Sequence, residues 1–587
     1  MVLSRIPTET QKEIIYRKKG LFTVRACPGS GKTFTVAARL NRLLLGWGAK
    51  HQGIATISFT NVAWEEIQEY LVKEFGHPQV ISYPHFLGTI DSFINRYIFL
   101  PFGYLLMECD SRPNLIGPPH NDYEPVGNKG IRPWPYQECN KQCNLNDFSY
   151  DHDKTLINRK YRSLGDKCTK VPEHPCAKEK RSFIKKGLAT QADANYFALR
   201  ILQKYPNVTK GLGIRFPMMM VDEAQDTSRI QMMILELLVE NGLNEMMLVG
   251  DPDQAIYEWR EAEPRLFAEK CSAWKDNSIE LSENWRSSQF ICNFANRFSS
   301  ASNSNKMKAV NPLLRECSTQ VEIWPYKAVG ELPTLYERFE KHCTTKIGIS
   351  FSESGILARG TEFLNSIRPG SAPQHNINPW KDSLSRALAE ARYLLDRGGF
   401  RDALRTAERE LVKQRSGATI FHAEDLEAIH GKIGFSNWRS GVFGLLNQLP
   451  MSDVNLSTWI SHANCLLAHI KHFPEATLQV KRNSAKCRYG DLTFEEVFGT
   501  PKRLSDSQSC HIGTVHSVKG RTLEGVMLVL KQKAGKGGNY INILDNDIVE
   551  DEELRILYVA ITRPQKVLVL VVPEKDERKW REHILPL

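Results

Sequence analysis

Eight consecutive residues at positions 26–33, ACPGSGKT, combine small side chains with one lysine and one threonine. At this spacing they suit a phosphate-binding loop, in which backbone N–H groups surround phosphate oxygens. Lys32 would reach the outer phosphates, and the Thr33 hydroxyl would help to hold Mg²⁺. The strict pattern begins with glycine, whereas Ala26 stands here, so a flexible turn without a ligand is the alternative interpretation.

The sequence on either side of this segment predicts a strand before it and a helix after it. LFTVRAC is rich in β-forming residues, and KTFTVAARLNRLLL carries apolar residues at helical spacing. A loop between a strand and a helix directs its N–H groups and the helix N-terminus toward one anion. This context favours nucleotide binding by Ala26, Cys27, Pro28, Gly29, Ser30, Gly31, Lys32 and Thr33.

A second candidate for chemistry is the acidic pair in FPMMMVDEAQDTS. An apolar strand over 216–221 would end in Asp222 and Glu223, and parallel α/β sheets present catalytic groups at such strand ends. Asp222 would act through Mg²⁺, and Glu223 would orient or deprotonate a water molecule. The pair could also cap the helix that begins in DTSRIQMM, and both interpretations can hold together.

Further strands and helices alternate along the chain. MMLVGD is another apolar run that ends in polar residues, and NVAWEEIQEYLVKEF has a helical pattern. Alternation of this kind predicts a doubly wound nucleotide-binding domain, so the expected fold class is α/β.

With these motifs in hand, the chain resembles the superfamily 1 DNA helicases of the UvrD, Rep and PcrA type, in which alanine commonly begins the phosphate loop. The GDPDQAIYEW segment favours the DNA-directed branch over the RNA-directed one. Seven further segments occur in the family's order: ISFTNVAWEEI, GTIDSFINRY, VDEAQDTS, GDPDQAIYEWR, LSENWRSS, IGTVHSVKG and LRILYVAITRPQ.

The resemblance implies two RecA-like motor domains with doubly wound parallel sheets, each interrupted by a mainly helical accessory insertion. Domain 1A is expected at 1–97 and 190–280 with insertion 1B at 98–189, and domain 2A at 281–365 and 505–587 with insertion 2B at 366–504. The strands of the second sheet are expected at QVEIWPY, GILAR, HIGTVH, VMLVL and KVLVLVVP.

The resemblance also assigns roles around ATP and Mg²⁺, the implied cofactors. Gln11 would read the adenine edge, Trp285 would pack on the adenine face, and Glu524 would bind the ribose. Gln254 would link the γ-phosphate to the DNA site, and Arg286 and Arg563 would act across the cleft on transition-state charge. The expected catalytic set is Lys32, Asp222, Glu223, Gln254, Arg286 and Arg563, with Thr33 and Asp222 at the metal.

On the DNA side, the resemblance places aromatic side chains against bases, an interaction that tolerates any sequence. Taken singly, each aromatic residue would more often belong to the core. Two positions depart from the family pattern, because Phe34 and Asp91 stand where relatives often have arginine and histidine. The expected DNA-binding residues are Phe59, Thr60, Asn61, Thr89, Tyr257, Trp259, Arg260 and His516.

The first insertion includes Cys139, Cys143, Cys168 and Cys176. Four sulfur atoms could bind zinc or an iron–sulfur cluster, but their spacing matches no common site, and structural thiols are the alternative. The nearby KEKRSFIKK could touch duplex phosphates or form a solvated face.

Composition sets broad limits on the class of protein. Among 587 residues, Lys and Arg exceed Asp and Glu by ten, a mild surplus that suits a polyanionic partner. Thirteen scattered cysteines favour a reducing compartment, and neither a signal peptide nor a long apolar run is apparent. We therefore expect a cytoplasmic protein without a membrane partner.

These observations predict an ATP-dependent 3′-to-5′ DNA helicase or translocase that acts on single-stranded and tailed duplex DNA. The polarity follows from the resemblance alone. DNA repair and an anti-phage defence module of the Gabija kind are the two pathways considered, and any nuclease is expected as a separate subunit. The alternative function is an ATPase that senses DNA and ATP and regulates a partner nuclease without processive unwinding.

Overall fold

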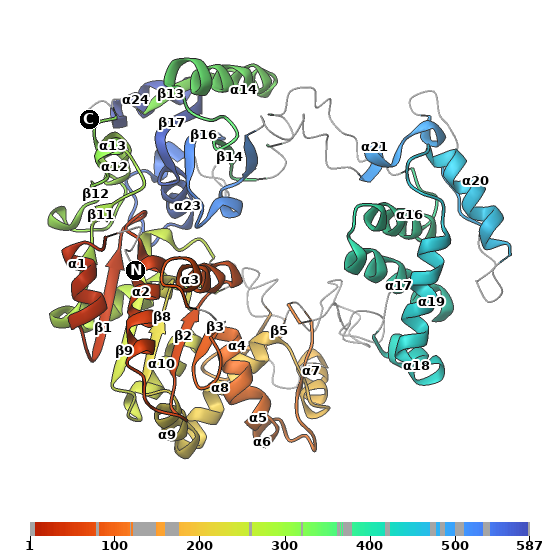
Figure 1. The fold of residues 1–587 in the computed structure, drawn as a ribbon, viewed down its shortest axis with the longest axis horizontal. Helices are drawn as coiled ribbons and strands as arrows, with labels where there is room; N and C mark the ends of the chain where they lie inside the picture. The colour runs from red at the N-terminus through yellow and green to blue at the C-terminus, as the bar shows by residue number, and fades with distance from the viewer. Residues whose placement is uncertain are drawn as a thin grey trace. The chain divides into compact units, whose positions relative to one another are not determined.

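The computed structural model forms two compact units among the residues that it describes (Figure 1). The first unit takes its described residues from 1–116, 148–371 and 508–587, and the second takes most of its own from 372–507. The first unit includes most of the described parts of the first insertion, and residues 117 and 119–120 belong to the second unit. The structure describes residues 6–77, 81–117, 119–120, 148–158, 175–257, 261–317, 321–360, 364, 367, 379–416, 423–469, 477–481, 488–498, 510–531 and 540–584.

A six-stranded parallel sheet organises the first half of the first unit. Its strand order is β10-β1-β9-β8-β2-β3, and every neighbouring pair is parallel. The order places β8 between β9 and β2, so three segments distant in sequence end at one edge. The strands are β1 (Leu21–Ala26), β2 (Ile54–Ser58), β3 (Phe86–Thr89), β8 (Met218–Val221), β9 (Glu245–Gly250) and β10 (Ile279–Leu281).

Both faces of this sheet are buried, which explains its unbroken apolar strands. On β8, Met219 belongs to the core under α8 (Gln191–Lys204) and α10 (Arg229–Glu240), whereas Met220 belongs to the core under α2 (Lys32–Leu45) and α3 (Asn61–Lys73). Successive side chains of a strand point to opposite faces, so the run of methionines serves two cores. The predicted α/β class and doubly wound arrangement are confirmed.

A second parallel sheet, of five strands, forms the other half of the first unit, in the order β13-β17-β16-β14-β15. All five sequence segments predicted for this sheet are strands, which confirms that prediction. In Figure 1, α14 (Leu332–Lys341) lies beside β13. The strands are β13 (Glu322–Tyr326), β14 (Gly355–Ala358), β15 (His511–Thr514), β16 (Leu523–Val529) and β17 (Pro564–Pro573).

The second sheet is likewise covered on both faces. One core packs α12 (Gln289–Ala295) and α23 (Glu552–Ile561) against β16 and β17, and the other packs α14 against the opposite face. We call the described residues of 6–281 in the first unit the first half, and those of 283–360 and 510–584 the second half.

Shorter elements complete the first unit. The small sheets pair β4 (Asn114–Leu115) with β7 (Leu188–Ala189), β5 (Phe148–Tyr150) with β6 (Leu156–Asn158), and β11 (Glu283–Asn284) with β12 (Lys308–Ala309). The remaining α-helices are α1 (Glu9–Lys12), α4 (Ile90–Ile94), α5 (Leu100–Phe102), α6 (Tyr104–Met107), α7 (Pro175–Lys185), α9 (Pro206–Arg215), α11 (Pro264–Ala273), α13 (Pro312–Arg315), α22 (Tyr540–Ile543) and α24 (Glu577–Ile584).

Helix α7 carries most of the cationic KEKRSFIKK segment. One of its lysines, Lys180, is fully buried and forms an ion pair of 2.6 Å with Asp193, itself in the capping box of α8. Phe183 and Ile184 are buried as well. The segment is therefore not a wholly solvated face, because Lys180, Phe183 and Ile184 are buried. Its contact with duplex phosphates stays a prediction.

The second unit is helical in its described part, as expected for the second insertion. Its first two described helices are α16 (Ser383–Asp396) and α17 (Phe400–Ser416). The others are α18 (Ala423–Ile433), α19 (Phe435–Gln448), α20 (Leu456–Leu467) and α21 (Phe494–Phe498), around a core that includes the fully buried Trp459. None of the helices in the described parts of either unit has the length and apolar character needed to cross a membrane.

Candidate nucleotide site between two parallel sheets

The phosphate-loop segment follows β1 and leads into α2, as predicted. Gly29 has a φ of 71° and Gly31, the residue before α2, has a φ of 79°, a region in which side chains with a Cβ are strained. A Cβ at Gly29 would lie 2.7 Å from the Cβ of Arg286. The buried Ser30 hydroxyl has no hydrogen-bond partner among the described residues. The loop therefore needs glycine twice and keeps a polar atom for a ligand.

The strand β8 delivers the acidic pair to the same sheet edge. Asp222 donates its N–H to the carbonyl of Ile57 on β2 at 2.8 Å, and its buried Oδ2 has no partner within the described part of the chain. Burial raises the pKa of Asp222 to about 8, with a further contribution from the charge of Glu223. An unpartnered, buried carboxylate oxygen of this kind fits a divalent cation.

Glu223, which is half-buried and lines the cleft, experiences a different electrostatic environment. Burial alone would raise its pKa, but the charges of Lys32 and Lys519 lower it below the ordinary value. Gln225 donates a hydrogen bond from its Nε2 to the Glu223 carboxylate. Glu223 is therefore held ionised and oriented, which is the state required of a group that activates water.

Two further residues of this motif were missed by the sequence analysis. Gln225 is fully buried and accepts the N–H of Asp251 at 3.0 Å, so it connects the ends of β8 and β9. Asp226 forms a buried ion pair of 2.6 Å with Lys519 from the second half. The sequence signal that could have identified these two residues is the run AQDTS after Glu223, which has more polar residues than a helix cap needs.

Gln254 lies at the interface of the two halves, in the short turn Pro252–Gln254 after β9. Its Oε1 accepts a hydrogen bond of 2.9 Å from Arg563, and its Nε2 donates to Asp251 at 2.7 Å. Burial, with the neighbouring charge of Arg286, lowers the pKa of Arg563 to about 9. The guanidinium thus remains charged at neutral pH while it joins the two halves.

Contacts from the second half also reach the phosphate loop itself. Asn284 donates to the carbonyl of Pro28 at 2.8 Å, and the N–H of Trp285 donates to the carbonyl of Gly29 at 2.9 Å. Arg286 is held within its own half by Thr522, whose hydroxyl accepts from Nε at 2.9 Å. The loop and the arginine are therefore positioned by one continuous set of backbone and side-chain contacts.

These residues surround a cleft of about 750 Å³ between the halves. Five of the predicted ATP and metal ligands do not line it, namely Gln11, Ala26, Pro28, Asp222 and Glu524. Gln11 donates to the carbonyl of Ser30 at 2.9 Å and accepts the N–H of Thr8 at 3.1 Å, and Glu524 is held by Lys566 and by the N–H of Ser350, each at 2.8 Å. The lining residues that were predicted are Cys27, Gly29, Ser30, Gly31, Lys32, Thr33, Thr60, Glu223, Gln254, Tyr257, Trp285, Arg286, His516 and Arg563.

The adenine contact expected of Gln11 and the ribose contact expected of Glu524 stay predictions. In the structure both side chains bond to the protein itself. Phe34 also lines the cleft, where an arginine is common in the resembling family. It is buried against Tyr70 and Phe75, with ring centroids 5.8 and 6.0 Å away. Phe34 therefore packs into the core behind this wall of the cleft.

Of the predicted DNA-side aromatics, Tyr257 lines this cleft. Phe59 and Tyr257 stack on each other with ring centroids 5.6 Å apart, and Lys519 lies 4.4 Å from the Tyr257 ring. His516 contacts the carbonyl of Ile256 at 3.2 Å, and burial, with the charge of Arg359, lowers its pKa. Trp259 and Arg260 fall outside the described residues.

The smaller DNA-side candidates have local roles in the structure. Thr60 accepts the N–H of Ala63 at the start of α3, and Thr89 accepts that of Ser92 at the start of α4. Asn61 is exposed. Asp91, which departs from the family pattern, accepts hydrogen bonds from Asn195 at 3.2 Å and from α10. It therefore stabilises packing within the first half.

The four cysteines considered for a metal site have no described side chains. Cys139, Cys143 and Cys168 lie outside the described residues, as does the side chain of Cys176. Among the side chains that are described, no group of three His, Cys, Asp or Glu residues is arranged to hold a metal ion.

A phosphate loop on one parallel sheet, faced by arginines from a second, defines a two-sheet nucleotide-binding motor of the P-loop class. Residues 7–102 and 135–274 match the family model of the UvrD/REP helicase N-terminal domain, and residues 498–575 match that of the UvrD-like helicase C-terminal domain. The chain belongs to the UvrD-type helicases of superfamily 1A.

Individual relatives share parts of this sequence. DNA helicase II of Haemophilus influenzae is 26% identical over 323 residues, which cover 51% of this chain and 41% of that protein. An ATP-dependent helicase/nuclease subunit of Streptococcus pneumoniae is 42% identical over 110 residues, 18% of this chain and 9% of that protein. The exonuclease/helicase subunit RexA of Lactococcus lactis is 40% identical over an equal length. The chain thus spans less than half the length of these relatives.

Proposed function

We propose that this chain is an ATP-dependent DNA helicase or translocase that couples hydrolysis to 3′-to-5′ movement on single-stranded DNA. The observation that carries the proposal is the cleft, where Lys32 and Glu223 of the first half face Arg286 and Arg563 of the second. This arrangement acts on a phosphoryl group only when the halves are together, so hydrolysis depends on their closure. The proposed polarity rests on the resemblance to this family.

Magnesium fits the carboxylate end of β8. The buried Oδ2 of Asp222 lacks a partner among described residues, and Thr33 lines the cleft at the start of α2. We propose that these two residues hold Mg²⁺, which would neutralise charge on the β- and γ-phosphate oxygens. Lys32 would bind the outer phosphates from the same helix N-terminus.

The chain's own residues then supply the remaining steps. Glu223, ionised and oriented by Gln225, would position the attacking water and take its proton. Arg286 and Arg563 would stabilise the charge that develops on the transferred group, an effect of about 10³- to 10⁵-fold where arginine fingers act.

DNA would be sensed through the segment that follows Gln254. Only two residues separate Gln254, bound to Arg563, from Tyr257, stacked on Phe59. A base that inserts between the two rings would displace Tyr257 and move the turn that contacts Arg563. We propose that this short connection links base stacking to ATP hydrolysis, with DNA repair or anti-phage defence as the pathway.

A second candidate is an ATPase that senses DNA and regulates a separate nuclease without processive unwinding. The observation in its favour is the short match to a relative named as a helicase/nuclease subunit. The two candidates share the ATP site and differ in strand displacement.

The test measures ATP hydrolysis with and without single-stranded DNA, and then displacement of duplexes that carry a 3′ or a 5′ tail. DNA-stimulated hydrolysis with displacement from the 3′ tail supports the helicase. Stimulated hydrolysis without displacement supports the regulatory ATPase. The matched control is Glu223→Gln, which keeps the shape of the side chain. A wild-type rate equal to that of this variant would overturn both candidates.

A further inference from the structure

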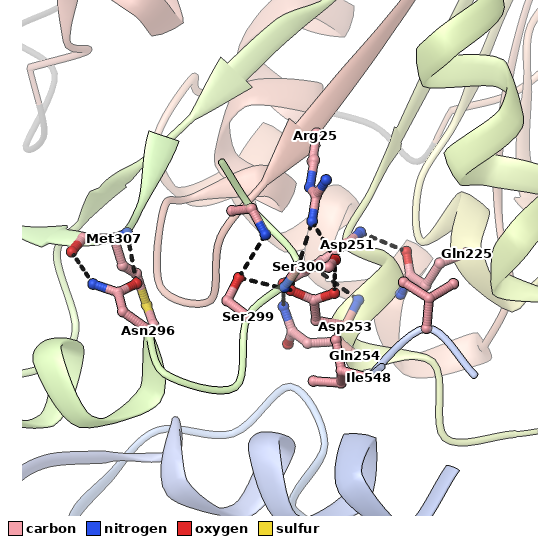
Figure 2. A network of polar contacts seen from close by, with 12 residues as sticks. Arg25, Gln225, Asp251, Asp253, Gln254, Asn296, Ser299, Ser300, Met307 and Ile548 are labelled. Carbon is pink, nitrogen blue, oxygen red and sulfur yellow. Dashed lines mark hydrogen bonds and ion pairs between the residues drawn. The ribbon is translucent and has the colours of Figure 1, made fainter. Parts of the chain in front are cut away.

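The turn that carries Gln254 is also held by its preceding residue, Asp253. This carboxylate is buried in the first half, yet its hydrogen-bond donors come from the loop after α12 in the second half (Figure 2). Ser299 donates its hydroxyl to Oδ2 at 2.7 Å, and the N–H of Ser300 donates to the same oxygen at 3.0 Å. The Ser300 hydroxyl donates to Oδ1.

A cation from the first half completes this cluster. Arg25, at the end of β1 next to the phosphate loop, lies 3.6 Å from the Asp253 carboxylate and donates to the Ser300 hydroxyl at 2.7 Å. Figure 2 shows these side chains converging on Asp253. The cluster therefore ties together β1, the turn after β9 and the serine loop of the second half.

The same turn is anchored to the second half at two more points. Arg555, fully buried on α23, donates to the carbonyl of Ala255 at 2.5 Å, and His516 contacts the carbonyl of Ile256. Asp253 is nonetheless the side chain of this turn that accepts several donors from the other half. Hydrogen bonds to an ionised group are among the stronger ones in proteins.

We infer that Asp253, Ser299 and Ser300 form a cross-cleft latch that sets the register of the two halves for hydrolysis. The inference rests on the proposed ATPase function and deepens it. Asp253 and the two serines are positioning residues, because they act through the adjacent Gln254 and its contact with Arg563. When the latch is made, Gln254 and Arg563 are aligned, and when it is broken, the halves separate without losing the nucleotide loop.

The experiment compares Ser299→Ala/Ser300→Ala with a matched control from the same loop, Ser302→Ala/Ser304→Ala. The control serines are exposed and contact each other at 3.1 Å. Loss of two hydroxyl donors to a buried carboxylate should lower the DNA-stimulated kcat about tenfold. The control should hydrolyse ATP at the wild-type rate. The single variant Ser300→Thr, which keeps a hydroxyl at this position, should also retain activity.

Hydrogen exchange gives a readout that does not depend on activity. In the Ser299→Ala/Ser300→Ala variant, amides of 250–257 should exchange faster although no residue of that segment has been changed. A double-mutant cycle with Asp253→Asn should be non-additive, because both changes break the same contacts.

Two results would overturn the latch. One is unchanged exchange in 250–257, and the other is an equal loss of kcat in the control. If wild type fails to hydrolyse ATP, the proposed function fails, while the exchange measurement still decides whether the contact joins the halves.

Discussion

Arg563 is a side chain of the second half that contacts the first half at the nucleotide site. It is buried, and it donates to Gln254 across the cleft. Burial lowers its pKa to about 9, which is still above neutral pH. Its guanidinium carries charge at a buried position, where electrostatic interactions are stronger than in water. In the proposed hydrolysis, this buried charge would act on the transferred phosphoryl group.

Replacing Arg563 with alanine should reduce the DNA-stimulated kcat by about 10³-fold, the lower range for arginine fingers. Steady-state hydrolysis at saturating ATP measures this loss. Arg578→Ala is the control, because that side chain is 91% exposed and pairs with Glu582. Full activity in Arg563→Ala would contradict the role assigned to the arginine.

The buried pair of Lys180 and Asp193 supports a prediction about stability. Asp193→Asn leaves the Lys180 charge buried without its carboxylate partner, which should cost about 3–5 kcal/mol in unfolding free energy. Urea unfolding followed by fluorescence measures the change. Lys185→Ala removes a lysine of the same helix from an exposed pair with Glu108, and its midpoint should not move. Equal midpoints for the two variants would show that the buried pair is not needed.

At the scale of elements, the strand-to-helix loop of the phosphate site depends on backbone geometry. Gly29 combines a positive φ with a close approach by Arg286 from the other half. The stacked Phe59 and Tyr257 come from the ends of β2 and β9, on either side of β8 in the sheet. Both features arise where parallel strands end together.

Gly29→Ala should reduce kcat/KM for ATP roughly tenfold, because left-handed backbone strain and a clash with the second half act together. Hydrolysis assays with and without DNA measure the effect. Gly48→Ala serves as the control, since a Cβ there meets no atom within 4 Å. Wild-type kinetics in Gly29→Ala would mean that the halves need not approach this loop.

Replacing both Phe59 and Tyr257 with alanine should weaken single-stranded DNA binding by about 1–3 kcal/mol for each lost base stack. Fluorescence anisotropy with a labelled oligonucleotide measures the affinity, and hydrolysis without DNA should be retained. Tyr104→Ala, at an exposed position on α6, is the matched aromatic control. Unchanged affinity in the double variant would remove these rings from the DNA site.

At the scale of the whole molecule, the two compact units differ in architecture. The first is built on two parallel sheets whose contacts form the cleft, and the second is helical in its described part with its own core around Trp459. A separate core is the physical requirement for a segment to fold by itself. The second unit therefore invites a test in isolation.

A fragment of residues 372–507 should fold alone into a helical domain with a cooperative melting transition. Circular dichroism measures the helix content, and fluorescence of the buried Trp459 follows loss of the core. The control replaces Trp459 with alanine, which should lower the melting temperature. A fragment that melts without cooperativity would show that this core needs the rest of the chain.

Short sequence patterns were enough to predict individual loops and strands of this protein. The loop at 26–33, the acidic end of β8 and all five strands of the second sheet follow from short patterns, because apolar periodicity and turn chemistry act over a few residues. The order of the motifs was sufficient to indicate the family. The burial of Lys180 was not foreseen, since a cationic segment reads as solvated until its partner Asp193 is placed beside it.

The tertiary structure alone decided which of these parts meet. Arg563 contacts Gln254 across 309 positions of sequence, and Lys519 contacts Asp226 across 293. It also decided that the side chains of Gln11 and Glu524 bond to the protein rather than line the cleft. Such pairings depend on how two whole sheets approach each other, and no local pattern encodes that approach.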